Sequence, residues 1–148
     1  MRPDANTYYL NIAKAVSARS TCLRRQSGAV IVKNDEIIST GYNGGVRGGI
    51  NCCDKGYCPR NDMPHNSGDY SQCYGVHAEQ NAIISASRSE MLGATLYLFG
   101  TENGNDITDI EPCPICRKIM CNAGITKLVT ISSCNNIIQF KEDTKNEC

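Results

Sequence analysis

The stretch over residues 75–83, which reads GVHAEQNAI, is the most informative in the chain. It places His77, one of only two histidines, two residues before Glu79 and at the head of an apolar run that predicts a helix from His77 to about Ser87. On its own this pattern is equally consistent with an N-terminal cap and a first-turn acid, because acids are favoured at the positive end of a helix. The role of this helix start therefore depends on what the rest of the chain brings to it.

A second predicted helix start carries two cysteines. Residues 112–116 read PCPIC, and they open a predicted helix over 114–122 that ends at Ala123-Gly124. Two thiols three residues apart on one helical turn reach a single tetrahedral ion, and the helix amides stabilise their thiolates. A redox-active CxxC pair is the alternative that this motif leaves open.

Taken together, His77, Cys113 and Cys116 supply three zinc ligands and leave the fourth position of a tetrahedral ion open, as catalytic zinc sites do. Zinc lowers the pKa of a bound water to about 7, and a neighbouring carboxylate can carry its proton to a substrate nitrogen. We therefore expect Glu79 to be a proton shuttle rather than a ligand. The order H-x-E followed by P-C-x-x-C is typical of zinc-dependent nucleobase deaminases.

Apolar periodicity elsewhere indicates a layered α/β domain. The other expected elements are a helix over 7–18, a hairpin of strands 28–33 and 36–42 around Asn34-Asp35, strands over 94–99 and 127–132, and an edge strand over 137–140. This order predicts a mixed sheet covered by helices, within a single domain spanning residues 1–148.

Composition excludes several classes of protein. The 15 Lys and Arg residues balance 15 Asp and Glu residues, so the chain lacks the basic surface typical of nucleic-acid binding. The sequence shows no leader-like segment and no apolar run of membrane length, which predicts a cytoplasmic protein with no membrane partner. In a reducing compartment, its ten cysteines favour metal binding over a disulfide framework.

One long stretch, residues 43–73, lacks periodicity. It is rich in glycine, and it carries the possible metal ligands Cys52, Cys53, Cys58, His65 and Cys73. Loops of this length inside a compact domain are usually functional or disordered. A bound metal ion is a further way to hold such a loop in place.

The chain resembles the deoxycytidylate deaminases over about residues 1–129. The resemblance is carried by RSTCLRR at 19–25, GAVIV at 28–32, TGYNG at 40–44, HAEQNAI at 77–83, ATLY at 94–97, PCPIC at 112–116 and NAGI at 122–125. It implies the three-layer α/β/α fold of cytidine deaminases with a mixed five-stranded sheet, and hydrolysis of dCMP to dUMP and ammonia with a catalytic Zn²⁺. It also implies that the Ala78 backbone contacts the base, Asn43 the deoxyribose hydroxyl and Arg24 the 5′-phosphate.

The same resemblance implies partners beyond the substrate. Deoxycytidylate deaminases are commonly homo-oligomers, often hexamers, and many are activated by dCTP with Mg²⁺ and inhibited by dTTP. The glycine-rich run over 44–49 is the expected cradle for the effector phosphates, with Gly44 and Arg47 as its contacts. Some relatives hold a second, structural Zn²⁺. Its expected ligands here are Cys22 and Cys52, completed by His65, Cys58 or Cys73.

Departures from the family pattern leave other functions open. Residues 100–111 form an acidic insertion beside the zinc cysteines, and little chain follows residues 127–132, where relatives carry a tyrosine-bearing loop and a further helix. The alternatives are a deaminase of another substrate, such as cytidine or a tRNA adenosine, and a zinc-stabilised module that senses nucleotides without turnover. A thiol redox protein is a more distant alternative.

Overall fold

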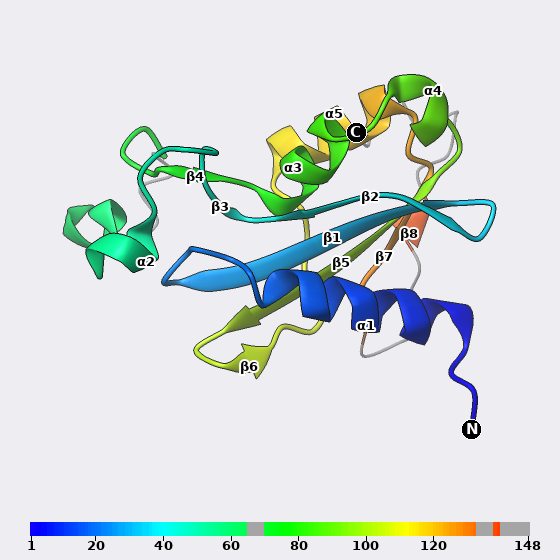
Figure 1. Cartoon of the computed structure of the whole chain (residues 1–148), viewed down its shortest axis with the longest axis horizontal. Helices are drawn as coiled ribbons and strands as arrows, with labels where there is room; N and C mark the ends of the chain where they lie inside the picture. Colours follow the sequence, from blue (N-terminus) through cyan, green and yellow to red (C-terminus); the bar gives the residue numbers. More distant parts are fainter. Residues whose placement is uncertain (65–69, 133–137, 140–148) are drawn as a thin grey trace.

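The computed structural model describes residues 1–64, 70–132 and 138–139. Its centre is a sheet with strand order β2-β1-β5-β7-β8, and a short sixth strand, β6, pairs with β5. Helix α1 covers one face of this sheet, and α3, α4 and α5 lie on the other (Figure 1). Strands β5 and β7 are parallel while the other neighbours are antiparallel. The expected three-layer α/β/α fold with a mixed sheet is confirmed.

Many of the helices and strands are short. In chain order they are α1 (Ala5–Ser17), β1 (Arg25–Lys33), β2 (Glu36–Tyr42), β3 (Gly44–Gly45), α2 (Cys52–Lys55), the 3-10 helix η1 (Pro59–Asp62), β4 (Gly75–Val76), α3 (Ala78–Ile84), α4 (Arg88–Met91), β5 (Thr95–Glu102), β6 (Asn105–Asp106), α5 (Pro114–Ala123), β7 (Lys127–Val129) and β8 (Ile138–Gln139). Strands β3 and β4 form a separate two-stranded ribbon. Within the described part of the chain, every helix is too short or too polar to cross a bilayer.

The hairpin of β1 and β2 follows from its turn residues. Asn34 and Asp35 adopt φ angles of 52° and 60°. A two-residue hairpin turn requires this left-handed conformation, and Asn and Asp tolerate it better than other side chains. Lys33 pairs with Glu36 across the turn, as the sequence predicts.

Apolar cores lie on both faces of the sheet. Because successive side chains of a strand point to opposite faces, the central strands β1 and β5 contribute to both cores and are buried along most of their length. The core under α3 and α5 includes Ile31, Leu96, Leu98, Met120 and Leu128, and the core under α1 includes Tyr9, Val30, Tyr97, Phe99 and Val129. Helices α3 and α5 therefore rest on one apolar core and α1 on the other.

The helix predicted from His77 to about Ser87 is shorter than expected. Helix α3 ends at Ile84, and Ser87 is the N-cap of a separate short helix, α4. The Ser87 hydroxyl accepts from the Glu90 amide, while the Glu90 carboxylate accepts from the Ser87 amide at 3.0 Å. This reciprocal capping box satisfies two amides at once, so a new helix start is favoured over continuation of α3.

The insertion over residues 100–111 extends the sheet. Strand β5 continues to Glu102, Asn103 and Gly104 turn with φ angles of 52° and 78°, and β6 pairs back onto β5. Ile107 and Ile110 then pack against the core. The insertion is therefore a hairpin anchored on the sheet edge.

Two C-terminal strand predictions are corrected in length. The strand predicted over 127–132 ends at Val129. The predicted edge strand over 137–140 is observed as β8, Ile138–Gln139, antiparallel to β7. Residues 137 and 140 lie outside the described residues.

Gly41 allows β2 and α3 to approach closely. A Cβ atom at this position would lie 2.3 Å from the Ala82 amide nitrogen and 2.5 Å from the Ala78 carbonyl oxygen. Overpacking usually costs about 1–3 kcal/mol, and the obstructing atoms here are backbone atoms that cannot rotate away. We expect Gly41→Ala to lower the free energy of unfolding in urea by about 3 kcal/mol.

Gly75→Ala is the matched control for this measurement. Its new Cβ would meet only the Cys73 sulfur at 3.4 Å and the Gly44 carbonyl oxygen at 3.9 Å, which are ordinary contact distances. We expect this variant to change the free energy of unfolding by less than about 1 kcal/mol. Equal losses in the two variants would contradict the close approach of β2 and α3.

Candidate active site

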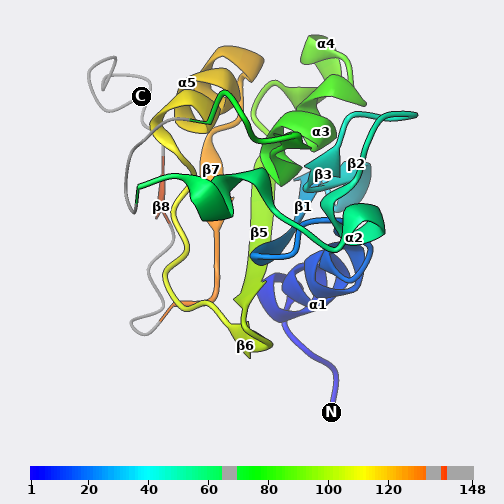
Figure 2. The same ribbon diagram turned by 90° about the vertical axis from the view of Figure 1, so that its left-hand side faces the viewer.

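The candidate site lies where α3 and α5 begin. His77 and Cys113 immediately precede the two helices, and both have extended backbone angles. Because α5 connects the parallel strands β5 and β7, it returns along the same face of the sheet as α3, and the two helices lie side by side (Figure 2). Residues 36 positions apart in the sequence are brought into contact at their N-termini.

The three expected zinc ligands converge. The His77 Nδ1 atom lies 3.1 Å from the Cys116 Sγ and 3.6 Å from the Cys113 Sγ, and all three ligand atoms lie within 4.8 Å of one another. A tetrahedral zinc ion with bonds of about 2.1 Å to nitrogen and 2.3 Å to sulfur separates its ligand atoms by about 3.6–3.8 Å. The donor set and its spacing therefore fit zinc, and both cysteines are free thiols.

Backbone hydrogen bonds hold this arrangement in place. The Gln80 side chain accepts from the His77 amide at 2.9 Å and fixes the backbone at the start of α3. The Cys116 amide donates to the Cys113 sulfur at 3.3 Å. That bond fixes the Cys113 sulfur at the start of α5.

The charged and buried groups of the site favour a bound cation. Burial raises the pKa of the Cys116 thiol, and the neighbouring Glu79 carboxylate and Cys113 thiolate raise it further. Without a positive charge, this fully buried sulfur would stay protonated. A metal ion reverses that preference, because a coordinating thiol is deprotonated outright.

Glu79 lies in the first turn of α3 and is only 6% exposed. Burial raises the pKa of its carboxyl, while its own backbone amide and His77 oppose the shift. A buried carboxyl with a raised pKa beside a potential metal site is suited to accept and return protons near neutral pH.

The residues expected to contact substrate differ in exposure and in hydrogen bonding. Ala78 is the buried first residue of α3, and Arg24 is exposed just before β1. Asn43 is already engaged. Its side-chain oxygen accepts from the Ser27 amide at 2.8 Å and from the Ser20 hydroxyl at 2.6 Å, and its amide donates to the Arg25 carbonyl at 2.8 Å. Asn43 thus ties the α1–β1 connection to the end of β2.

Four further cysteines, Cys22, Cys52, Cys58 and Cys73, form what we call the second cysteine set. Burial raises the pKa of the Cys52 thiol, and the nearby Cys58, Cys22 and Cys73 raise it further. Among the described residues, however, only His77, Cys113 and Cys116 gather three such ligand atoms within 4.8 Å. His65, the remaining expected ligand, lies outside the described residues.

One cysteine of α5 is paired. Cys121 is disulfide-bonded, whereas the second cysteine set and Cys53 are free thiols. A paired cysteine at this position was not predicted from the sequence.

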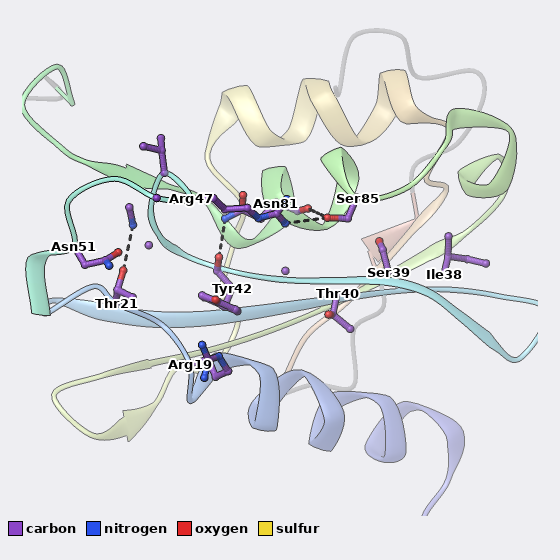
Figure 3. Close-up of a pocket in the computed structure, with 15 residues that line it drawn as sticks. Arg19, Thr21, Ile38, Ser39, Thr40, Tyr42, Arg47, Asn51, Asn81 and Ser85 are labelled. Carbon is purple, nitrogen blue, oxygen red and sulfur yellow. Dashed lines mark hydrogen bonds between the residues drawn. The ribbon is translucent and has the colours of Figure 1, made fainter. Parts of the chain in front are cut away.

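A separate cavity of about 640 Å³ lies between β2, the glycine-rich run and α3 (Figure 3). Both expected effector contacts, Gly44 and Arg47, line it, and none of the three candidate zinc ligands does. The Arg47 guanidinium donates to the Ser85 hydroxyl at 3.2 Å. Arg19 also lines the cavity, and its guanidinium lies over the Tyr42 ring at 5.8 Å.

No pattern in the sequence indicated a site role for Arg19, Arg60 or Tyr70. The rings of Tyr70 and His77 meet edge to face with centroids 6.4 Å apart, and Arg60 lies over Tyr70. Arg60 and Tyr70 belong to the long stretch without periodicity, which offers no signal for contacts across the fold. Arg19 and Arg47 share a charge but lie far apart in sequence, so only the fold pairs them.

Comparison with known proteins identifies the class. Residues 3–132 match the family model described as the cytidine and deoxycytidylate deaminase zinc-binding region. The chain is 38% identical over 135 residues to the deoxycytidylate deaminase of Mycobacterium phage D29, covering 86% of this chain and 94% of that protein. It is 37% identical to the deoxycytidylate deaminase of Enterobacteria phage T4, covering 81% and 74%. This chain belongs to the cytidine and deoxycytidylate deaminase family.

Solved structures agree with this assignment. The dCMP deaminase of cyanophage S-TIM5 in apo form has a TM-score of 0.62 and 29% identity, covering 89% of this chain and 86% of that one. The same enzyme in complex with dCMP and dUMP has a TM-score of 0.62 and 28% identity, covering 88% and 82%. The chain spans only 39% of the length of a similar deoxycytidylate deaminase from Schizosaccharomyces pombe, to which it is 34% identical.

Zinc content tests the candidate metal centre. Replacing Cys116 by serine removes a buried sulfur from the three-ligand set. We expect Cys116→Ser to bind one zinc ion per chain fewer than the unmodified protein after dialysis, measured by atomic absorption. Cys53→Ser is the control, because Cys53 is exposed and outside both cysteine groups, and its zinc content should not change. Equal zinc in the Cys116 variant would contradict the site.

Proposed function

We propose that this chain is a single-domain, zinc-dependent deaminase that hydrolyses dCMP to dUMP and ammonia. The observation that carries the proposal is the buried Glu79 beside three convergent zinc-type ligands. Structural zinc sites are usually closed by four protein ligands, whereas catalytic sites keep one position open. Family membership and the similar dCMP deaminase of cyanophage S-TIM5 support deoxycytidylate as the substrate.

In this proposal the protein groups divide the work. His77, Cys113 and Cys116 hold the zinc ion, which when bound makes a water molecule nucleophilic at neutral pH. Glu79 accepts a proton from the water that attacks C4 of the cytosine. It returns that proton to N3. As the C4–N bond breaks, Glu79 carries the second proton, from the hydroxyl added at C4, to the departing amine, which leaves as ammonia while C4 becomes a carbonyl. One water is consumed for each dCMP converted.

The proposed substrate contacts extend outward from the zinc ligands. The Ala78 backbone contacts the base, Asn43 the deoxyribose hydroxyl and Arg24 the 5′-phosphate. The exposed position of Arg24 is compatible with phosphate binding, since a guanidinium matches the geometry of phosphate oxygens. The amide of Asn43 has one further hydrogen to donate beyond the bond to Arg25.

Loss of the proton shuttle tests the catalytic proposal. We expect Glu79→Gln to lower kcat for dCMP by about 10²–10⁴-fold, because the amide cannot accept the proton, while zinc content stays at the unmodified level. The ultraviolet change on conversion of dCMP to dUMP reports the rate. Glu36→Gln, at the exposed β1–β2 turn, is the control and should retain full activity. Unchanged activity in Glu79→Gln would favour an idle Glu79 and a nucleotide-sensing module.

Other substrates are compared in the same assay. Turnover of cytidine and deoxycytidine beside dCMP separates a nucleotide deaminase from a nucleoside deaminase. The zero formal net charge argues against a tRNA substrate, because phosphate contacts dominate nucleic-acid affinity.

The cavity beside α3 supports a regulatory proposal. We assign it to a nucleotide effector, dCTP with Mg²⁺ as activator or dTTP as inhibitor, contacted through Gly44 and Arg47. Arg19 adds a second positive charge, which suits a polyphosphate. We also propose a cytoplasmic homo-oligomer, with a hexamer favoured. Ile84 of α3 and Ile115 of α5 are 68% and 63% exposed on the same layer, and such apolar side chains are suited to subunit contact.

Removal of one cavity charge tests the effector site. We expect Arg47→Gln to weaken the effect of dCTP with Mg²⁺ on the rate by about tenfold in effector concentration, because a charge-assisted hydrogen bond is lost. Activity at saturating dCMP without effector should remain, because Arg47 lies outside the zinc ligands. Titration of the initial rate with dCTP measures the change. An unaltered midpoint would place the effector elsewhere.

We further propose a structural Zn²⁺ held by Cys22 and Cys52, completed by Cys58, Cys73 or His65. The clustering of the second cysteine set around Cys52 supports it. The zinc measurement described for Cys116→Ser tests this as well. Two ions in the unmodified protein and one in the variant are expected, whereas a single ion in the unmodified protein would contradict the second site.

A further inference from the structure

Tyr70 is an exposed aromatic residue beside a zinc ligand. Its ring meets the His77 imidazole edge to face, with centroids 6.4 Å apart and planes at 71°. Yet 53% of its surface remains exposed, so packing against His77 does not bury it. It comes from the stretch that links β3 to β4 and lies beside the candidate active site through this contact with His77.

Arg60 packs on the Tyr70 ring. Its guanidinium carbon is 4.1 Å from the centre of the Tyr70 ring, a close cation–π contact. Its Nε atom is buried and lacks a hydrogen-bond partner. Among the described residues the structure gives Arg60 no ion pair, and the neighbouring Asp62 carboxylate accepts instead from the Tyr57 hydroxyl. Among the described residues, the Arg60 Nε thus remains a buried donor without an acceptor.

The separation between this cation and the zinc ligands matches one class of ligand. The Tyr70 ring centre lies 6.4 Å from the His77 ring centre and 4.1 Å from the Arg60 guanidinium carbon. These two distances set the largest separation between the imidazole and the guanidinium, and it is comparable with the span from the base of a nucleotide to its 5′-phosphate. They therefore allow a nucleotide whose base lies beside His77 to place its phosphate near Arg60.

We infer that Arg60, held by Tyr70, is a phosphate-binding residue of the active site and makes the enzyme select the nucleotide over the nucleoside. This inference rests on the proposed deaminase function, and it adds a second cation to the contact proposed for Arg24. A planar guanidinium binds phosphate oxygens through paired N–H groups. The Tyr70 ring restrains the arginine before substrate arrives, which lowers the entropy lost on binding.

Paired substrates test the inference. We expect Arg60→Gln to lower kcat/KM for dCMP by about 10- to 100-fold while kcat/KM for deoxycytidine, which lacks the phosphate, stays within about twofold. Arg60→Lys keeps the charge but loses the fork, and its dCMP rate should lie between the two. Arg2→Gln removes an equal charge at the exposed N-terminal end and serves as the control, with both rates unchanged.

Equal losses for both substrates would assign Arg60 a merely structural role and overturn the inference, as would an unaltered preference for dCMP. Binding of dUMP against deoxyuridine, measured by calorimetry, separates this result from failure of the proposed function. If the unmodified protein does not turn over dCMP, the deamination proposal fails. The inference then stands only if the preference for dUMP over deoxyuridine exists and is lost in Arg60→Gln.

Discussion

The structure depends on the convergence of three metal-type ligands and one buried carboxyl on one point. Cys113 and Cys116 approach His77 within 3.6 Å, and burial, followed by the neighbouring Glu79, raises the pKa of the Cys116 thiol. The ionised form of this thiol is therefore unfavourable without a compensating cation. The same arrangement with a zinc ion is favourable, and it supplies a nucleophile and a proton carrier together. A bound zinc ion would therefore both stabilise this group of four residues and enable its chemistry.

The sheet brings the N-termini of α3 and α5 together. The parallel pairing of β5 and β7 sends α5 back across the face that α3 already occupies. Gly41 lets α3 lie directly on β2, and the buried Ser39 hydroxyl donates to the Ala82 carbonyl at 2.6 Å to hold the helix there. Small errors in this packing would displace His77 and Glu79 together. The residues that position the site thus lie in the sheet below it.

The long stretch between β3 and β4 contributes side chains beside the candidate zinc centre. It brings Arg60 and Tyr70 to the zinc side of the domain, while the glycine-rich run before it contributes Arg47 to a separate cavity near α3. In the proposed reaction the zinc ligands and Glu79 act at the bond that is broken, and the arginines are the proposed contacts to the substrate and effector phosphates.

Local signals in the sequence determined much of this protein. The Asn34-Asp35 turn, the Gly124 helix end and the two halves of the zinc motif each act over a few residues, and each was predicted because its physical cause is local. The earlier end of α3 at Ile84 and the short helix α4 after it were missed, because a capping box at Ser87 competed with apolar periodicity.

Only the tertiary structure decided which distant charges share a space. The pairing of Arg19 with Arg47 and the stacking of Arg60 on Tyr70 beside His77 have no signature in the spacing of the residues. Contacts of this kind arise from how a loop crosses a packed sheet, which depends on the whole fold rather than on neighbouring side chains.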